Sequence, residues 1–144
     1  MVMGQMVLDC ENMSPSARAY ATEHGLCSAD GDVGTQDIRY GNCGYSYIYV
    51  WNNGKHGVAD FGYGFGSDLG PVVWRSLRVN WSNLDLGKAG SFTDRSVMAG
   101  TTYAAIRSAT TGVGEVFAGL TGYVTLLWGG ECTLLVPTDY GIIW

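Results

Sequence analysis

The stretch CGYSYIYVWNNGKHG, residues 43–57, decides the fold class because its side chains alternate between two kinds. Successive side chains of an extended strand point to opposite faces of the sheet. Four aromatic residues would then share one face: Tyr45, Tyr47, Tyr49 and Trp51. The Asn53-Gly54 pair that follows is the strongest short-range hairpin signal. The segment predicts a strand over 44–51, a turn, and a returning strand over 57–65.

The register of this hairpin determines what faces the aromatic residues. With a two-residue turn, Trp51 lies opposite His56, and Tyr47 lies opposite Asp60. The other face of the hairpin, which carries Ile48 and Val50, then has few large apolar side chains. With a five-residue loop, Tyr47 lies opposite Phe61 and Tyr45 lies opposite Tyr63 instead, and the face becomes almost wholly aromatic. A slip of one residue exchanges the two faces, so both registers remain open at this point.

Alternation and turn signals continue along the chain and predict further strands, which are 72–81, 97–107, 113–128, 131–136 and 139–144, with a turn region at 82–91. The composition agrees, because charged residues make up only 15% of the chain, against about 25% in typical domains. Glycine is also abundant, at 22 of the 144 residues, which suits tight turns. We expect one domain over 1–144, mainly β, with an antiparallel β-sandwich or barrel of about seven strands in 44–144.

One short helix is predicted ahead of the strands, in SPSARAYATEHG, residues 14–25. Ser14 is a good N-cap, Pro15 suits the first helical position, and Gly25 suits the left-handed residue that ends a helix. Ala17 and Ala21 lie four residues apart, so that they share a side of the helix that can pack.

The four cysteines, Cys10, Cys27, Cys43 and Cys132, are even in number and contain no CxxC pair. Four cysteines allow three pairings. We favour 10–27, which flanks the helix, together with 43–132, which joins two predicted strands. The alternative is four buried free thiols in a cytosolic protein.

The segment 28–42 is polar and rich in glycine, and it predicts a loop. Asp30, Asp32 and Asp37 occupy positions 1, 3 and 8 of its acidic part, where carboxylate oxygens are of the type that calcium binds. Position 5 is Gly34 rather than a further oxygen ligand. A solvated acidic loop is therefore favoured over a calcium site, and no other cofactor is expected.

Charge and hydropathy exclude several classes of partner. The net charge is −5, and the basic residues are scattered singly, so no basic stripe is present to bind nucleic acid. No run of apolar residues is long enough to span a membrane. The opening MVMGQMVLDC lacks the pattern of a signal peptide, yet the paired cysteines favour a mature secreted form. Arginine outnumbers lysine, and glycine and alanine are abundant, which indicates a bacterial source.

Catalytic signals are weak. The chain contains no GxSxG motif, and a disulfide-bonded Cys27 close to His24 is not a nucleophile. Carboxylates for a small hydrolase exist, but the sequence does not bring two of them together; they are Asp60, Asp68, Glu115 and Glu131. Whether the protein is an enzyme stays open, and a non-catalytic role is favoured.

Two functions follow from the pattern. The aromatic face is either core or a platform for sugar rings, with polar partners Asn52, His56 and Asp60 in the same hairpin. In the second case the protein is a secreted binding module for a carbohydrate or cell-surface polymer. The alternative is a self-assembling or protein-interaction domain that pairs through an exposed edge strand such as 139–144, giving a homo-oligomer.

Overall fold

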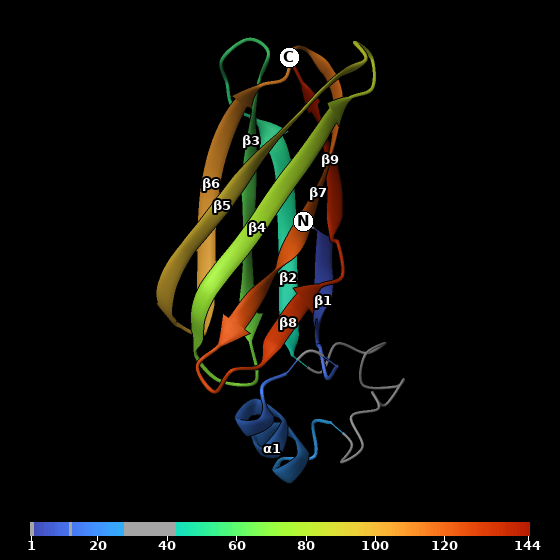
Figure 1. The fold of residues 1–144 in the computed structure, drawn as a ribbon. Coiled ribbons are helices and arrows are strands. Elements are labelled where there is room, and N and C mark those ends of the chain that lie inside the picture. Colours follow the sequence, from blue (N-terminus) through green and yellow to red (C-terminus); the bar gives the residue numbers. More distant parts are fainter. Residues whose placement is uncertain (1, 12, 28–42) are drawn as a thin grey trace.

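The computed structural model describes residues 2–11, 13–27 and 43–144, which form one short helix and nine strands (Figure 1). The predicted calcium ligands Asp30, Asp32 and Asp37 lie outside the described residues. The helix is α1 (Pro15–Glu23), and the strands are β1 (Val2–Leu8), β2 (Gly44–Asn52), β3 (Val58–Ser67), β4 (Val72–Asn83), β5 (Lys88–Gly100), β6 (Thr102–Thr110), β7 (Gly114–Leu126), β8 (Glu131–Leu134) and β9 (Thr138–Ile143).

All strand pairs are antiparallel, and eight strands follow one another in the order β5-β4-β7-β8-β1-β2-β3-β6, with β9 paired to β7. The sheet curls until it nearly closes into a barrel, with β4 and β5 in front of β2, β3 and β6 in Figure 1. The predicted class, mainly β and antiparallel with one N-terminal helix, is confirmed, with nine strands in place of about seven.

Different strands lie between β7 and β2 at the two ends of the barrel. Near one end, β8 and β1 lie between them, with Val124 paired to Cys132 and Met6 paired to Gly44. Near the other end, β9 takes this place, because the backbone N–H of Val50 donates to the Asp139 carboxylate at 2.9 Å. The predicted strand at 139–144 therefore has a ladder to β7 on one side, and on its other side single hydrogen bonds rather than a second ladder join it to β2.

The two ends of the sheet, β5 and β6, are joined by the single residue Thr101 and form the open seam of the barrel. Among the strand pairings of the described residues, none joins β5 to β6. In Figure 1, β5 runs diagonally across the front while β6 stands behind it, so the two strands diverge from their junction.

Alternation along each strand fills the barrel with one apolar core. Strand β3 contributes the largest rings, Phe61, Tyr63 and Phe65, all at most 1% exposed. Residues of β4 and β7, including Leu77 and Leu120, pack in the same cluster. No helix in the described part of the chain is long and apolar enough to span a bilayer.

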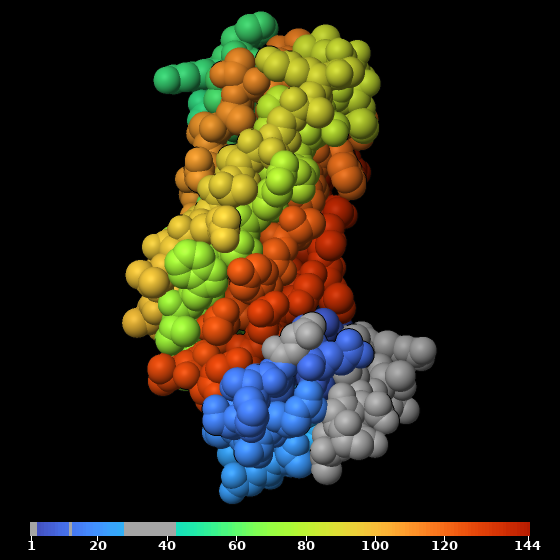
Figure 2. Space-filling view, in the orientation of Figure 1, coloured from blue at the N-terminus to red at the C-terminus, as the bar shows by residue number. Residues whose placement is uncertain are grey.

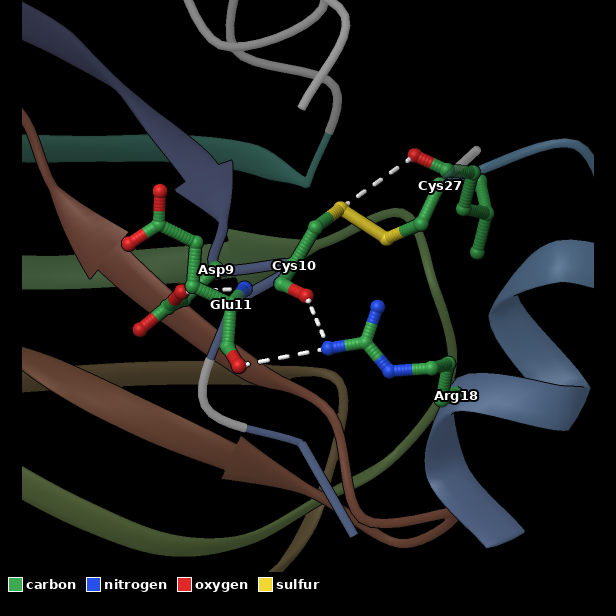
Figure 3. The surroundings of a disulfide bond; sticks show 6 residues. Asp9, Cys10, Glu11, Arg18 and Cys27 are labelled. Atoms are coloured by element: carbon green, nitrogen blue, oxygen red, sulfur yellow. Dashed lines mark hydrogen bonds between the residues drawn. A yellow bond between two sulfur atoms is a disulfide. The ribbon is translucent and has the colours of Figure 1, made fainter. Parts of the chain in front are cut away.

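Both predicted disulfides form, and together they use all four cysteines. The Cα atoms lie 5.8 Å apart in Cys10–Cys27 and 6.2 Å apart in Cys43–Cys132. The first disulfide attaches α1 to the end of β1 (Figure 3). Arg18 strengthens this attachment, because its Nη2 donates to the carbonyl oxygens of Cys10 at 2.9 Å and Glu11 at 3.2 Å.

The helix begins as its sequence predicts, since Ser14 Oγ accepts a hydrogen bond from the Ala17 N–H at 3.2 Å, and Ala17 and Ala21 are buried. It lies against one end of the barrel, below the strands in Figures 1 and 2. The helix thus covers that end rather than a face of the sheet.

Two sequence predictions about strands were wrong. The strand predicted at 97–107 is the end of β5 and most of β6, divided at Thr101, where the chain reverses. The turn predicted at 82–91 is shorter, because β4 continues to Asn83 and β5 starts at Lys88. Strand β1 was not predicted at all.

Candidate functional site

The aromatic row, which we define as Tyr45, Tyr47, Tyr49 and Trp51, lies on the outer face of β2. Its neighbours Ser46, Ile48 and Val50 point into the core, as the alternation of the strand requires. Tyr45 and Tyr49 are each 37% exposed and Trp51 is 36% exposed, whereas Tyr47 is more covered. The row is therefore a surface feature, and the rings of the core come from β3 instead.

Glycines of β3 lie beneath the row. Gly62, Gly64 and Gly66 are paired with Tyr49, Tyr47 and Tyr45. A Cβ added at Gly66 would lie 2.4 Å from the Tyr45 ring, and one added at Gly62 would lie 2.9 Å from the Trp51 ring. The rings thus lie over bare backbone, and a side chain at these positions would push them off the sheet. The alternating glycines in DFGYGFG, residues 60–66, were the sequence signal for this arrangement.

Both registers considered for the hairpin were wrong. Trp51 pairs with Asp60, and Tyr47 pairs with Gly64 rather than with Asp60 or Phe61, so the returning strand is shifted relative to both alternatives. The backbone N–H of Asn53 donates to the Val58 carbonyl at 3.0 Å and closes the hairpin loop. As the shorter turn implied, Asp60 shares the face of the row, while Phe61 points into the core.

The rings of the row are evenly spaced but not coplanar. Ring centroids are 6.5 Å apart for Tyr45 and Tyr47, 6.0 Å for Tyr47 and Tyr49, and 6.1 Å for Tyr49 and Trp51. The first pair is stacked at 22°, and the other two meet edge to face. Burial, followed by the neighbouring Tyr45 and Tyr49, raises the pKa of the Tyr47 phenol, so this hydroxyl stays protonated near neutral pH.

The three predicted polar partners are placed differently. Asp60 lies across from Trp51, and its Oδ1 accepts hydrogen bonds from Asn53 Nδ2 at 2.8 Å and from the Ser108 hydroxyl. Asn52 alternates away from the row, and its Oδ1 accepts from the Trp144 N–H at 3.1 Å. His56 is exposed in the hairpin loop. The structure therefore brings only Asp60 to the row.

A pocket of about 410 Å³ lies beside the Asp60 end of the row. Its lining comes from the hairpin loop and from the end of β6, and consists of Asn53, Lys55, Val58, Ser108, Ala109 and Thr110. Since Asn53 and Ser108 also hold Asp60, this pocket and the Trp51 end of the row share a polar rim.

A second cluster, which the sequence analysis missed, lies at the open seam. Asp94 of β5 accepts hydrogen bonds from Arg75 Nε at 2.9 Å, from the Tyr63 hydroxyl at 2.8 Å and from the Tyr103 hydroxyl. The Arg75 guanidinium also lies 3.9 Å from the centroid of the Tyr103 ring. These residues come from β3, β4, β5 and β6, so the cluster joins both sides of the seam through side chains.

The hydrogen bonds of this cluster set its protonation. Burial by itself would raise the pKa of the Asp94 carboxyl, but donation from Tyr103, Tyr63 and Arg75 and the charge of Arg75 lower it below its usual range. Burial, together with donation to Asp94, raises the pKa of Tyr63 and Tyr103. Near neutral pH, Asp94 is therefore ionised and both phenols are protonated, which are the states that these hydrogen bonds require.

The candidate carboxylates of a hydrolase do not pair along the strands that carry them. Asp60 lies near one end of β3, and Asp68 directly follows the other end, Ser67, which is roughly 23 Å from Asp60 at the rise of an extended strand. Glu115 lies near the start of β7 and pairs with Ile142 of β9. Glu131 of β8 pairs with Thr125, near the other end of β7. Paired catalytic carboxylates require separations of about 5–10 Å. Among the described residues, no three acidic, histidine or cysteine side chains form a group that could hold a metal ion.

Comparison of the chain with protein-family models, with curated proteins and with solved structures found no match.

Proposed function

We propose that the protein is a secreted, non-catalytic binding module whose aromatic row holds a carbohydrate polymer. The observation that carries the proposal is the position of the row on the outer face of β2, over the glycines of β3, while the core is filled by other rings. The apolar face of a pyranose stacks on such rings, and its hydroxyls require polar partners.

The polar and charged surroundings support a neutral glycan. Oδ1 of Asp60 is held by Asn53 and Ser108, and Oδ2 accepts no hydrogen bond from the described residues. This oxygen can accept from a sugar hydroxyl beside Trp51. The net charge of −5 disfavours polyanionic polymers. Two disulfides suit an oxidising compartment outside the cytosol.

The change Trp51→Ala tests the row directly. We expect binding of a soluble oligosaccharide to weaken by roughly tenfold, as is typical when an aromatic anchor is truncated. Stability should fall by only about 1 kcal/mol, because the ring is partly exposed, whereas a core ring would cost about 3–5 kcal/mol. A glycan array identifies the probe, calorimetric titration measures its affinity, and a thermal melt measures stability.

Trp74→Ala is the matched control, because Trp74 is a half-buried tryptophan on β4, in the front layer of Figure 1. It should leave affinity unchanged. An empty array for the parent protein, or equal loss of binding in both variants, would overturn the proposed function.

A second candidate function, self-assembly through an edge strand, is favoured by the free edge of β6. The outward-facing residues of β6 carry no charge, Ile106 at its centre is 66% exposed, and the charged Arg107 is directed across the seam, where its Nη1 donates to the Thr93 carbonyl at 3.1 Å. Two copies of β6 related by a twofold axis through Ile106 would place Ala104 of one copy opposite Ser108 of the other.

For this candidate, Ile106→Lys would place two like charges opposite each other at the axis. We expect a dimer of the parent, detected by light scattering over a concentration series, to become a monomer in this variant. Val97→Lys, on the outer face of β5, is the control and should leave the dimer intact. A parent protein that stays monomeric throughout the series would exclude this second candidate.

A further inference from the structure

A second pocket of about 410 Å³ lies at the other end of the barrel, between the helix and the β3–β4 turn. The helix side contributes Tyr20, His24 and Leu26, and the turn contributes Asp68, Leu69 and Gly70. The Cys10–Cys27 disulfide and the Arg18 hydrogen bonds hold the helix side in place (Figure 3).

Two rings of one stack, Tyr20 and His24, line this pocket, and the third ring, Trp128, packs behind Tyr20. The Tyr20 ring lies 4.5 Å from the Trp128 ring and 4.0 Å from the His24 ring, with interplanar angles of 24° and 20°. Trp128 Nε1 donates to the Leu69 carbonyl at 2.9 Å, which ties the stack to the turn on the opposite side. The stack and the turn therefore hold each other in position, as in a preformed ligand pocket.

Two side chains of the pocket, His24 and Asp68, present acceptors, and the Tyr20 hydroxyl can both donate and accept. His24 Nδ1 lies 2.9 Å from the Tyr20 carbonyl oxygen, which can only accept, so the hydrogen of a neutral ring is on Nδ1. Nε2 is then an acceptor. No described residue donates to the exposed Asp68 carboxylate, which adds further acceptor oxygens. A complementary ligand must donate hydrogen bonds and present an apolar face to Leu26 and Leu69, which describes a sugar ring with its hydroxyls.

The pocket continues the line of the aromatic row. Tyr45, at one end of the row, covers Gly66 of β3. The Asp68 N–H donates to the Cys43 carbonyl at 2.8 Å, directly after the last pair of the β2–β3 ladder, Gly44 and Ser67. Asp68 thus lies directly beyond the end of β3, two residues after Gly66, on the side of Tyr45 away from the rest of the row.

We propose that the pocket between α1 and the β3–β4 turn binds the terminal sugar of the glycan that lies along the aromatic row. This inference rests on the proposed function of the row and adds that the protein recognises a chain end. The helix lies beyond the ends of β2 and β3 in Figure 1, so a polymer that runs along the row meets α1 there. His24 and Asp68 would accept from the hydroxyls of that last ring.

Fluorine NMR of protein labelled with 5-fluorotryptophan separates the two sites. Trp51 belongs to the row, and Trp128 lies behind the Tyr20 wall of the pocket; Trp51→Phe and Trp128→Phe assign their resonances. The probes are glucose, N-acetylglucosamine, mannose, galactose and xylose, and soluble oligosaccharides built from each. We expect the matching monosaccharide to shift the Trp128 resonance alone and its oligosaccharide to shift both resonances.

Asp68→Asn removes the charged acceptor and keeps its shape. We expect the affinity of the monosaccharide, measured at the Trp128 resonance, to fall by roughly tenfold, as for a lost charge-assisted hydrogen bond. Glu23→Gln is the matched control, because Glu23 is exposed in the last turn of α1 but does not line the pocket. It should bind as the parent does, and the thermal melts of both variants should match that of the parent.

The outcomes distinguish the two proposals. If oligosaccharides shift Trp51 but no probe shifts Trp128, the pocket inference fails and the proposed function of the row stands. If no probe shifts either resonance, both fail. If Trp128 responds equally in the parent and in Asp68→Asn, the assignment of Asp68 as a sugar acceptor is wrong.

Discussion

Replacing Cys43 and Cys132 together by alanine is expected to lower the free energy of unfolding by about 4–5 kcal/mol, the entropic effect of a crosslink that closes so long a loop. The two residues are 89 positions apart in the sequence, and both are fully buried. Their disulfide joins the start of β2 to β8, the two strands that flank β1. Equilibrium unfolding in denaturant, without reductant, measures the loss.

The double variant of Cys10 and Cys27 is the control for loop length. Its separation is 17 residues, for which the same relation gives about 3 kcal/mol. This crosslink lies at the helix, so its loss should free α1 while the barrel keeps its spectrum. If the 43–132 variant were as stable as the parent, this disulfide would not stabilise the fold by lowering the conformational entropy of the unfolded chain.

Asp94→Asn is expected to cost about 3 kcal/mol at neutral pH, the typical effect of removing one partner of a buried ion pair. The side chains of Asp94 and Arg75 are only 12% and 14% exposed, so the change leaves a poorly solvated guanidinium without its carboxylate. The side-chain links across the seam between β5 and β6 also weaken, because Tyr103 loses its charged acceptor. Denaturant unfolding at fixed pH measures this cost.

The pH dependence gives a second measurement on the same variant. The pKa of Asp94 is lower in the folded state than in the unfolded chain, so its contribution is present above about pH 4 and is lost as the pH falls through the folded pKa. The pKa values of Tyr63 and Tyr103 are raised by folding, so their contribution is lost as the pH rises above about 10. Asp94→Asn should flatten the acid limb, and the exposed control Glu23→Gln should retain it. An unchanged acid limb in Asp94→Asn would refute the role of the cluster.

Features that depend on neighbouring residues were predictable from the sequence. Ser14, Pro15 and Gly25 mark the helix through local capping geometry, and the alternation in 44–51 placed the aromatic row on one face of a strand. The disulfide pairing followed from the helix and strands that carry the cysteines. The sequence did not show whether the row lies in the core or on the surface, because the answer depends on the rings of β3, which fill the core in its place.

Features that depend on distant partners were not predictable. Strand β1 has no hairpin turn of its own, and its partners are Gly44–Ile48 of β2 and Cys132–Leu134 of β8. The polar start of β5 has little strand propensity and is extended by its pairing with β4. The Asp94 cluster joins residues of four strands, and no local pattern marks such a convergence.

The place of β1 between β2 and β8 has a kinetic consequence. Met6 pairs with Gly44 on one side and with Leu134 on the other, so the second ladder closes a loop of nearly the whole chain. Contacts so distant in sequence make folding slow, on the order of milliseconds to seconds for all-β domains. Until residues 131–134 arrive, β1 offers an unpaired edge to other nascent chains.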